Sequence, residues 1–159
     1  MLRSSWLAVA VAGWLIAGGV AAEPVKAQYV VVEKEARRLT LYRSGEVLRS
    51  YPIDLGGNPI GHKLYEGDQR TPEGTYSIDF KNPDSAYHLS LRISYPNDAD
   101  VARAQHRGLD PGGMIMIHGF GERRRRMPDW TDGCIAVSNR AIEEIWSMVD
   151  EATPVVIRP

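Results

Sequence analysis

Most of the chain alternates apolar and polar positions or shows short apolar runs, which is the pattern of β-strands. LTLYRSGEVLRSYPI (39–53) holds two alternating pieces around the turn sequence Arg43-Ser44-Gly45-Glu46, so it predicts a β-hairpin. MIMIH (114–118) and CIAV (134–137) are apolar throughout or nearly so, and they predict buried strands. Further strands are expected at 29–34, 75–80, 87–94 and 154–158.

One segment has a clear helical period. In SNRAIEEIWSMVD (138–150) the apolar residues Ile142, Ile145 and Val149 fall on one stripe, and Ser138 or Asn139 can cap the start. A shorter helix is expected within 98–109. Many strands and little helix predict a mixed or mainly antiparallel β fold with one packed helix.

The loop at 56–74 is long for a compact domain and rich in turn residues, and loops of this kind are often functional. The chain of 159 residues is the length of a single domain. Its composition is that of an ordinary soluble protein, 43% hydrophobic and 25% charged with a net charge of −1, and nothing in it indicates nucleic-acid binding.

The first 22 residues read as a cleaved signal peptide, because Arg3 precedes an uncharged apolar run and Val20-Ala21-Ala22 resembles a cleavage site. The alternative is a membrane anchor, for which the run is short. Cleavage removes Arg3 and no acidic residue, so the mature net charge becomes −2. Residues 23–27 are then a short linker and 28–159 the folded domain, and we expect a periplasmic protein.

Cys134 is the only cysteine of the chain, so in an oxidising compartment it cannot form an intramolecular disulfide. It follows Gly133 and opens a short apolar strand, whereas His118 ends another. Neighbouring strands would bring the thiol and the imidazole together, and an adjacent histidine is a common way to activate a thiol. A buried, inert cysteine is the alternative reading. The four histidines and Cys134 show no metal-ligand spacing.

Two motifs resemble a known family. MIMIHG (114–119) followed by TDGCIAVSN (131–139) is similar to the paired signature of the L,D-transpeptidase catalytic domain, the YkuD-type family. GDQRTPEGTY (67–76) resembles that family's segment with its Thr-Pro-x-Gly hallmark, and 41–56 resembles its opening hairpin. The resemblance covers roughly 29–159 and implies a mixed β-sandwich or barrel-like arrangement.

The resemblance implies a mechanism as well as a fold. Cys134 would be the nucleophile and His118 the general acid/base, and the backbone at Gly133 and beside Cys134 would be part of the oxyanion hole. The substrates would be peptidoglycan stem peptides, attacked to form a thioester acyl-enzyme. An acceptor stem would then give a cross-link, a lysine-bearing lipoprotein would be anchored, and water would release product. No cofactor is implied, and we expect a monomer.

The chain departs from the common Ser-His-Gly-Cys-x-Arg form of this signature, since it has Thr131, Asp132 and Ala136 at those positions. Asp132 would either orient His118 or face solvent. A branch of the family looks like this sequence, and some members look like hydrolases that cut a diaminopimelate amide. The alternatives to a transpeptidase are therefore an amidase or carboxypeptidase on the same scaffold and, in another class, a non-catalytic wall-binding module.

Several other residues are candidates for contact with substrate. The run Arg123–Arg126 lies between His118 and Cys134 and is either a solvated charge run or a patch for stem-peptide carboxylates. Within that run, Arg123 and Arg124 are the candidates for contact with substrate. Further candidates are His62 and Tyr65 in the long loop, for which a structural role is the alternative, and Gly119 beside His118.

Overall fold

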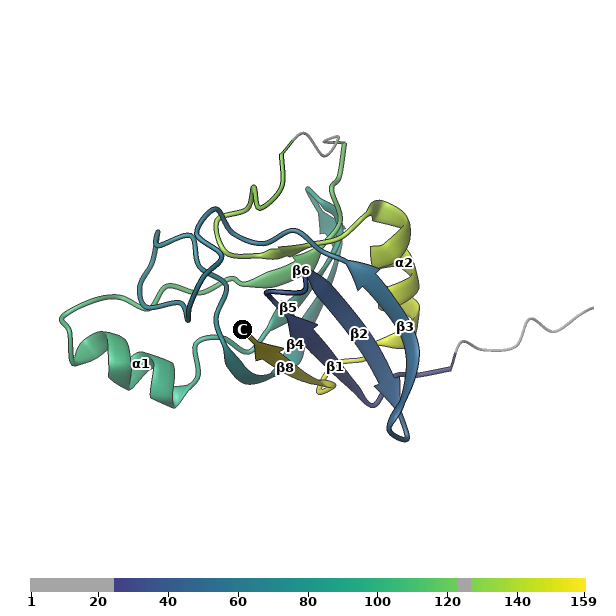
Figure 1. Cartoon of the computed structure of the whole chain (residues 1–159), viewed down its shortest axis with the longest axis horizontal. Coiled ribbons are helices and arrows are strands. Elements are labelled where there is room, and N and C mark those ends of the chain that lie inside the picture. Colours follow the sequence, from purple (N-terminus) through teal and green to yellow (C-terminus); the bar gives the residue numbers. More distant parts are fainter. Residues whose placement is uncertain (1–24, 123–126) are drawn as a thin grey trace, which may run out of the picture.

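The computed structural model describes residues 25–122 and 127–159, and it places them in one curved sheet with two helices (Figure 1). The eight strands lie in the order β3-β2-β1-β8-β4-β5-β6-β7. The bounds are β1 Tyr29–Glu33, β2 Arg38–Arg43, β3 Glu46–Pro52, β4 Gly74–Ser85, β5 His88–Ile93, α1 Asp98–Gln105, β6 Met116–His118, β7 Ile135–Ala136, α2 Asn139–Met148 and β8 Pro154–Arg158.

The predicted hairpin at 39–53 is formed by β2 and β3. Its turn residues Ser44 and Gly45 both have positive φ, 52° and 79°, as a two-residue turn that matches the twist of the strands requires. On the other side, β1 pairs antiparallel with β2 and parallel with β8. The N-terminal and C-terminal strands are therefore neighbours in the sheet.

Strand β4 joins the two halves of the sheet. Its first part, Gly74 to Ser77, pairs with β8, and its later part pairs with β5 across two irregularities in register. Such irregularities bend a strand and increase its twist. The sheet curls far enough for the segment after β3 to reach the opposite edge, where Asp54 exchanges two backbone hydrogen bonds with Ala136 of β7.

Helix α2 covers β5 and β6 with its apolar stripe (Figure 1). Ser138 caps its start by accepting a hydrogen bond from Ala141 N. Ile142 and Ile145 are fully buried in the core, and burial of each contributes roughly 1.5–3 kcal/mol relative to exposure. The helix therefore fixes the strand that carries His118.

The predicted fold class, mainly β with a packed helix, is confirmed, and the short helix expected within 98–109 is α1. Two expected strands are shorter than predicted. The run at 114–118 forms a strand only from Met116, because Met114 has a left-handed φ of 57°, outside the β region. The run at 134–137 pairs only at Ile135–Ala136.

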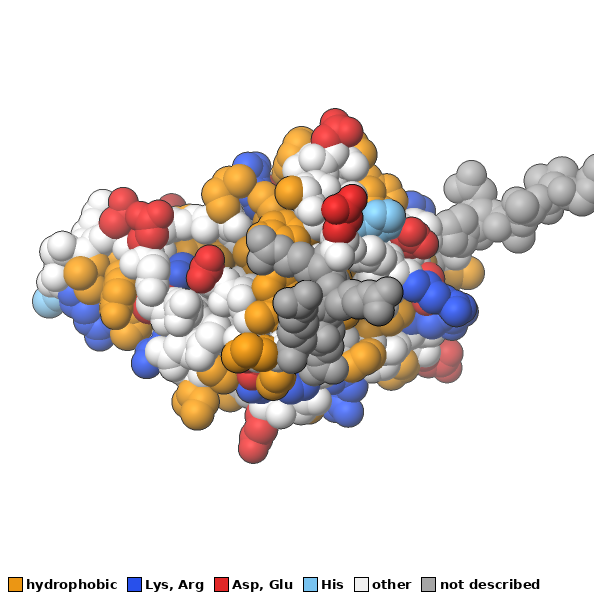
Figure 2. Space-filling model, turned by 90° about the horizontal axis from the view of Figure 1, so that it is seen from above, with side chains coloured by type: hydrophobic (Ala, Val, Ile, Leu, Met, Phe, Trp, Pro, Cys, Tyr) orange, Lys and Arg blue, Asp and Glu red, His pale blue; other side chains and the backbone are white. Residues whose placement is uncertain are grey.

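The predicted signal peptide (1–22) lies outside the described residues. Of the linker, residues 25–27 are described, and Ala27 N donates to Met148 O. Neither helix in the described part of the chain is long and apolar enough to cross a membrane. The face seen from above carries acidic and basic side chains interspersed with apolar ones among the residues drawn in colour (Figure 2).

Candidate active site

His118 and Cys134 lie on one face of two adjacent strands. Strands β6 and β7 run parallel, with Ile117 opposite Ile135 and His118 opposite Ala136. The two isoleucines are fully buried in the core, so the residues next to them in sequence face the other side of the sheet. Cys134 directly precedes β7 and is therefore a diagonal neighbour of His118.

The imidazole of His118 is buried and oriented. Only 3% of the residue is exposed, and its ring stacks on Tyr87, with 4.5 Å between centroids, and meets the edge of Trp130 at 5.8 Å. Its Nδ1 donates to the carbonyl of Gly119 at 2.6 Å, which leaves Nε2 as the proton acceptor. Burial lowers the pKa of His118, although the bond to Gly119 opposes this. The ring is therefore neutral and suited to act as a base.

The thiol of Cys134 is protonated at rest. It is partly exposed and donates a weak hydrogen bond to Met114 O at 3.6 Å. Burial raises its pKa and Asp132 adds to this, whereas a backbone hydrogen bond from Met116 and the charge of Lys63 lower it. A base is therefore needed to form the thiolate, and the strand register makes His118, diagonally across from Cys134, the candidate for that base.

The turn before Cys134 requires a glycine. Gly133 has φ 123°, and a Cβ on it would lie 2.6 Å from Arg70 O. Its carbonyl accepts from Thr71 Oγ1 at 2.8 Å, and Thr131 Oγ1 donates to Cys134 O at 2.7 Å. The turn is thus held from both sides, by the long loop and by its own threonine.

The two backbone amides expected at the oxyanion hole, at Gly133 and beside it at Cys134, have different hydrogen bonds. The N–H of Gly133 is used inside the turn, where it donates to Thr131 Oγ1 at 3.2 Å. The N–H of Cys134 itself makes no hydrogen bond with any residue the structure describes. The amide available to a developing oxyanion is therefore that of Cys134, while Gly133 gives the turn its shape.

Asp132 does not orient His118 in this structure. It is exposed, and its one hydrogen bond to a residue that the structure describes comes from Gln69 Nε2 at 3.4 Å. The group that orients the imidazole is the Gly119 carbonyl. Gly119 itself is tightly enclosed, since a Cβ there would lie 2.7 Å from both Asn139 Oδ1 and Tyr87 O. Close packing therefore explains why a glycine, and no larger residue, occupies position 119.

The other residues predicted to contact substrate differ in their exposure and in their hydrogen-bond partners. His62 is held by the loop and α1, with Nδ1 accepting from Glu73 N at 2.9 Å and Nε2 3.2 Å from Asp100 Oδ1. Burial lowers the pKa of His62, and the nearby Arg103 adds to this. Tyr65 is 42% exposed. Arg123 and Arg124 lie outside the described residues.

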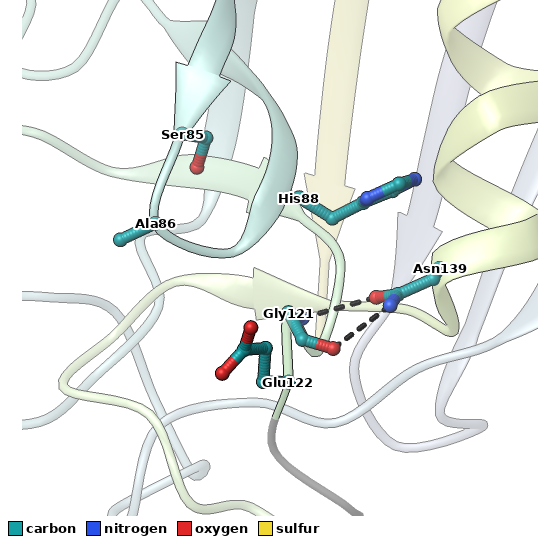
Figure 3. Close-up of a pocket in the computed structure, with 6 residues that line it drawn as sticks. All are labelled: Ser85, Ala86, His88, Gly121, Glu122 and Asn139. Atoms are coloured by element: carbon teal, nitrogen blue, oxygen red, sulfur yellow. Dashed lines mark hydrogen bonds between the residues drawn. The ribbon is translucent and has the colours of Figure 1, made fainter.

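The sequence did not predict that the aromatic rings of Tyr87 and Trp130 pack against His118. Tyr87 comes from the β4–β5 turn, far from His118 in sequence, and no local signal marks it. Behind this turn lies a hollow of about 590 Å³, lined by Ser85, Ala86, His88, Gly121, Glu122 and Asn139 (Figure 3). There Asn139 Oδ1 accepts from the backbone N–H of Gly121 at 3.0 Å, and Asn139 Nδ2 donates to the Gly121 carbonyl at 2.8 Å.

No group of three or more potential ligands is placed to hold a metal ion within 25–122 and 127–159. The described site instead has the parts of nucleophilic catalysis. These are a thiol, a neutral imidazole with a fixed tautomer, and a free backbone N–H beside the thiol.

Comparison with known proteins agrees with this arrangement. The family model of the YkuD-type L,D-transpeptidase catalytic domain matches residues 27–157. A putative L,D-transpeptidase of Escherichia coli K12, YafK, is 35% identical over 131 residues, which is 78% of this chain and 48% of YafK. The chain thus spans about half the length of the curated relatives it matches.

Solved structures show the same fold. The helical cell shape determining protein Pgp2 of Campylobacter jejuni superposes with a TM-score of 0.65 at 26% identity, covering 87% of this chain and 52% of that one. L,D-transpeptidase 1 of Mycobacterium tuberculosis has a TM-score of 0.54 at 18% identity, covering 84% and 62%, and this likeness concerns the fold alone. With a family match over nearly all of the described chain, the protein belongs to the L,D-transpeptidase catalytic domain family.

Proposed function

We propose that this protein is an exported, cysteine-dependent L,D-transpeptidase that acts on peptidoglycan stem peptides. The observation that carries the proposal is the register of β6 and β7, which places Cys134 diagonally across from a neutral His118 whose tautomer is fixed by Gly119 O. Membership of the family and the likeness to a cell shape determining protein support a substrate in the cell wall.

In the first half-reaction His118 Nε2 takes the proton of the Cys134 thiol, and the sulfur attacks the carbonyl carbon of the scissile amide. The N–H of Cys134 donates to the resulting oxyanion. The C–N bond then breaks, the leaving amine receives the proton from His118, and a thioester remains on Cys134.

In the second half-reaction an acceptor amine gives a proton to His118 and attacks the thioester carbon. The C–S bond breaks, and the thiolate takes the proton back from His118, which regenerates the neutral pair. A stem-peptide amine yields a cross-link, a lipoprotein lysine yields an anchored lipoprotein, and water yields a trimmed stem. The geometry serves all three, since each acceptor delivers one proton to the same nitrogen.

The test combines a covalent probe with product analysis. A carbapenem, an acylator of this family, should add its mass to the purified wild-type protein and not to Cys134→Ala or Cys134→Ser, both of which should remain folded. No adduct on folded wild-type protein would contradict the nucleophile assignment.

Purified muropeptides and a lysine-bearing lipoprotein incubated with the wild-type enzyme identify the acceptor. New cross-linked dimers support transpeptidation, and a lipoprotein joined to a stem supports anchoring. Trimmed monomers or freed lipoprotein without new linkages would replace the transpeptidase proposal with the hydrolase alternative. Binding of peptidoglycan without any turnover would support the wall-binding module.

A further inference from the structure

Met114 is an exposed methionine whose backbone contacts the Cys134 thiol. Its carbonyl accepts the weak hydrogen bond from Cys134 Sγ at 3.6 Å, and the residue is 62% exposed. Covalent geometry keeps the carbonyl oxygen and the Cβ of one residue close together, so the Met114 Cβ lies within roughly 7 Å of the sulfur. The rest of the methionine side chain extends beyond this Cβ and can border the path by which a substrate reaches the thiol.

The backbone of Met114 has a conformation that is unfavourable for a residue with a long side chain. Its φ is 57°, in the left-handed region that glycine and asparagine adopt most readily. Gly112, two residues earlier, has a similar φ of 69°. A glycine at 114 would fit the same backbone with less strain, so the methionine side chain does not stabilise the turn itself.

Contacts on both sides hold this strained residue in place. Before Met114, the carbonyl of Pro111 accepts from Tyr95 Oη at 2.8 Å. After it, Ile115 is buried in the core, and its carbonyl accepts from Ile93 N at 3.0 Å. A strained conformation persists only where the surrounding structure determines it, and such residues cluster at sites that bind ligands. The fold therefore fixes Met114 beside the thiol.

The side chain of Met114 does not contribute to the hydrophobic core, which includes Ile115 and not Met114. Single exposed apolar residues are common in proteins, but this one combines exposure with a strained backbone and a contact with the nucleophile. An exposed apolar side chain gains free energy when an apolar group covers it. The part of a substrate that suits this position is therefore aliphatic.

We propose that Met114 is a specificity-determining residue, whose side chain binds the aliphatic part of the acyl donor next to the carbonyl that Cys134 attacks. The inference rests on the proposed function, since it concerns the substrate of the same thiol. A methionine side chain is flexible and polarizable, so it can follow the shape of an alkyl chain. The Met114 carbonyl holds the thiol, and the side chain selects the group that approaches it.

A pair of alkylating reagents tests this contact without turnover. N-hexyl iodoacetamide carries an alkyl chain that iodoacetamide lacks, and both reagents form a C–S bond with Cys134 and release iodide. Compared with a free cysteine peptide, the wild-type thiol should favour the hexyl reagent on the order of 3- to 10-fold. Met114→Gly and Met114→Asn suit the left-handed backbone and should lose this preference, whereas Met114→Leu should retain it.

Ala152→Gly is the matched control. Ala152 is also exposed and left-handed, with φ 66°, but it lies in the turn between α2 and β8, where its N–H donates to Ile78 O at 2.7 Å. The variant should shift the urea midpoint in the same direction as Met114→Gly and keep the wild-type preference for the hexyl reagent. Folding of each variant is checked by circular dichroism before alkylation is measured.

Loss of the hexyl preference in Met114→Gly and Met114→Asn, with retention in Met114→Leu and Ala152→Gly, supports the proposal. No preference in the wild type, retention in either of the first two variants, or loss in either of the last two overturns it. If Met114→Gly does not fold, Met114→Asn decides. Failure of carbapenem acylation in the wild type would remove the proposed function, whereas intact acylation with an unchanged preference in Met114→Gly removes only the role of Met114.

Discussion

Burial determines the charge state of the two reacting side chains. Low solvent exposure disfavours the charged form of either group, which raises the pKa of the Cys134 thiol above its usual 9.0 and lowers the pKa of His118 below 6.5. The resting pair is therefore a thiol and a neutral imidazole, not a thiolate–imidazolium ion pair. Proton transfer then accompanies attack on the substrate.

This charge state predicts the pH dependence of acylation. Protonation of His118 removes the base, and since its pKa is lowered, the acid limb of carbapenem acylation should have its midpoint below pH 6.5. Acylation rates followed by mass spectrometry across the acid range would measure it. A midpoint above 6.5 would contradict a buried neutral His118. A cysteine-containing peptide treated in the same way is the control for any pH dependence of the carbapenem itself.

A single methyl group added at Gly133 should disturb the turn that presents the thiol. In Gly133→Ala the new Cβ would meet Arg70 O and the left-handed φ of 123° would be strained, which together should cost about 1–3 kcal/mol of stability. Acylation of Cys134 should fall by at least ~10², because the turn that presents the thiol and its N–H is displaced.

Gly45→Ala is the matched control for that substitution. Gly45 also has positive φ, 79°, but a Cβ there would meet nothing within 4 Å, and the hairpin turn that holds it is remote from Cys134 in the fold. The variant should lose about 1 kcal/mol in urea unfolding and keep wild-type acylation. Equal losses of acylation in both variants would refute the proposed role of the Gly133 turn.

The loop before Cys134 is held by a contact between distant segments. Asp129 accepts hydrogen bonds from Leu55 N at 3.0 Å and from Arg37 Nη2 at 2.7 Å, which ties the segment beside Trp130 to the β1–β2 turn and to the chain after β3. Trp130 in turn borders the His118 ring. A surface ion pair of this type is worth little alone, but here the carboxylate also satisfies a backbone N–H.

Asp129→Ala should therefore affect function more than stability. Loss of the carboxylate frees the loop, and acylation of Cys134 should fall about tenfold while unfolding in urea shifts by about 1–2 kcal/mol. Asp79→Ala, which breaks the comparable Arg92–Asp79 pair at 2.8 Å, lies on β4 away from the loop. It should leave acylation unchanged, and a similar loss in this variant would count against the anchoring role.

Individual strands and helices were predictable to the extent that their signals are local. The hairpin turn at Ser44-Gly45 and the apolar stripe of α2 are each determined by residues close together in sequence, and the structure contains both. The shortened strand at Met116 was not predictable, because the left-handed turn at Met114 is compatible with the apolar pattern around it. Nor does any local pattern show that β4 extends to Ser85.

For the molecule as a whole, the buried histidines couple stability to pH. The pKa values of His62 and His118 are lowered chiefly by burial, so below 6.5 the unfolded chain binds more protons than the folded one. The stability they contribute is complete above 6.5 and is lost as pH falls toward their folded pKa values. Asp68, whose pKa is lowered by its backbone and lysine partners against the effect of burial, adds a further loss below 3.8.

The free energy of unfolding should therefore be lower just below pH 6 than above pH 7, as measured by urea titration at each pH. His62→Gln, which keeps a polar group between Glu73 and Asp100 but cannot titrate, should reduce this difference without abolishing it, because His118 remains. A difference as large as that of the wild type would show that His62 does not contribute.

The sequence alone specified the mainly β architecture, the family and the two side chains proposed to react, because turn chemistry, apolar periodicity and the signatures around His118 and Cys134 are local. It did not specify the neighbouring groups that orient His118 and hold the turn before Cys134. The positions of Tyr87 beside His118 and of Thr71, which donates to the Gly133 carbonyl, depend on sheet order and on how the long loop packs. Burial is a property of contacts between segments distant in sequence. The bond from His118 Nδ1 to the adjacent Gly119 carbonyl depends on the ring orientation that these contacts impose, so both emerge only in the folded chain.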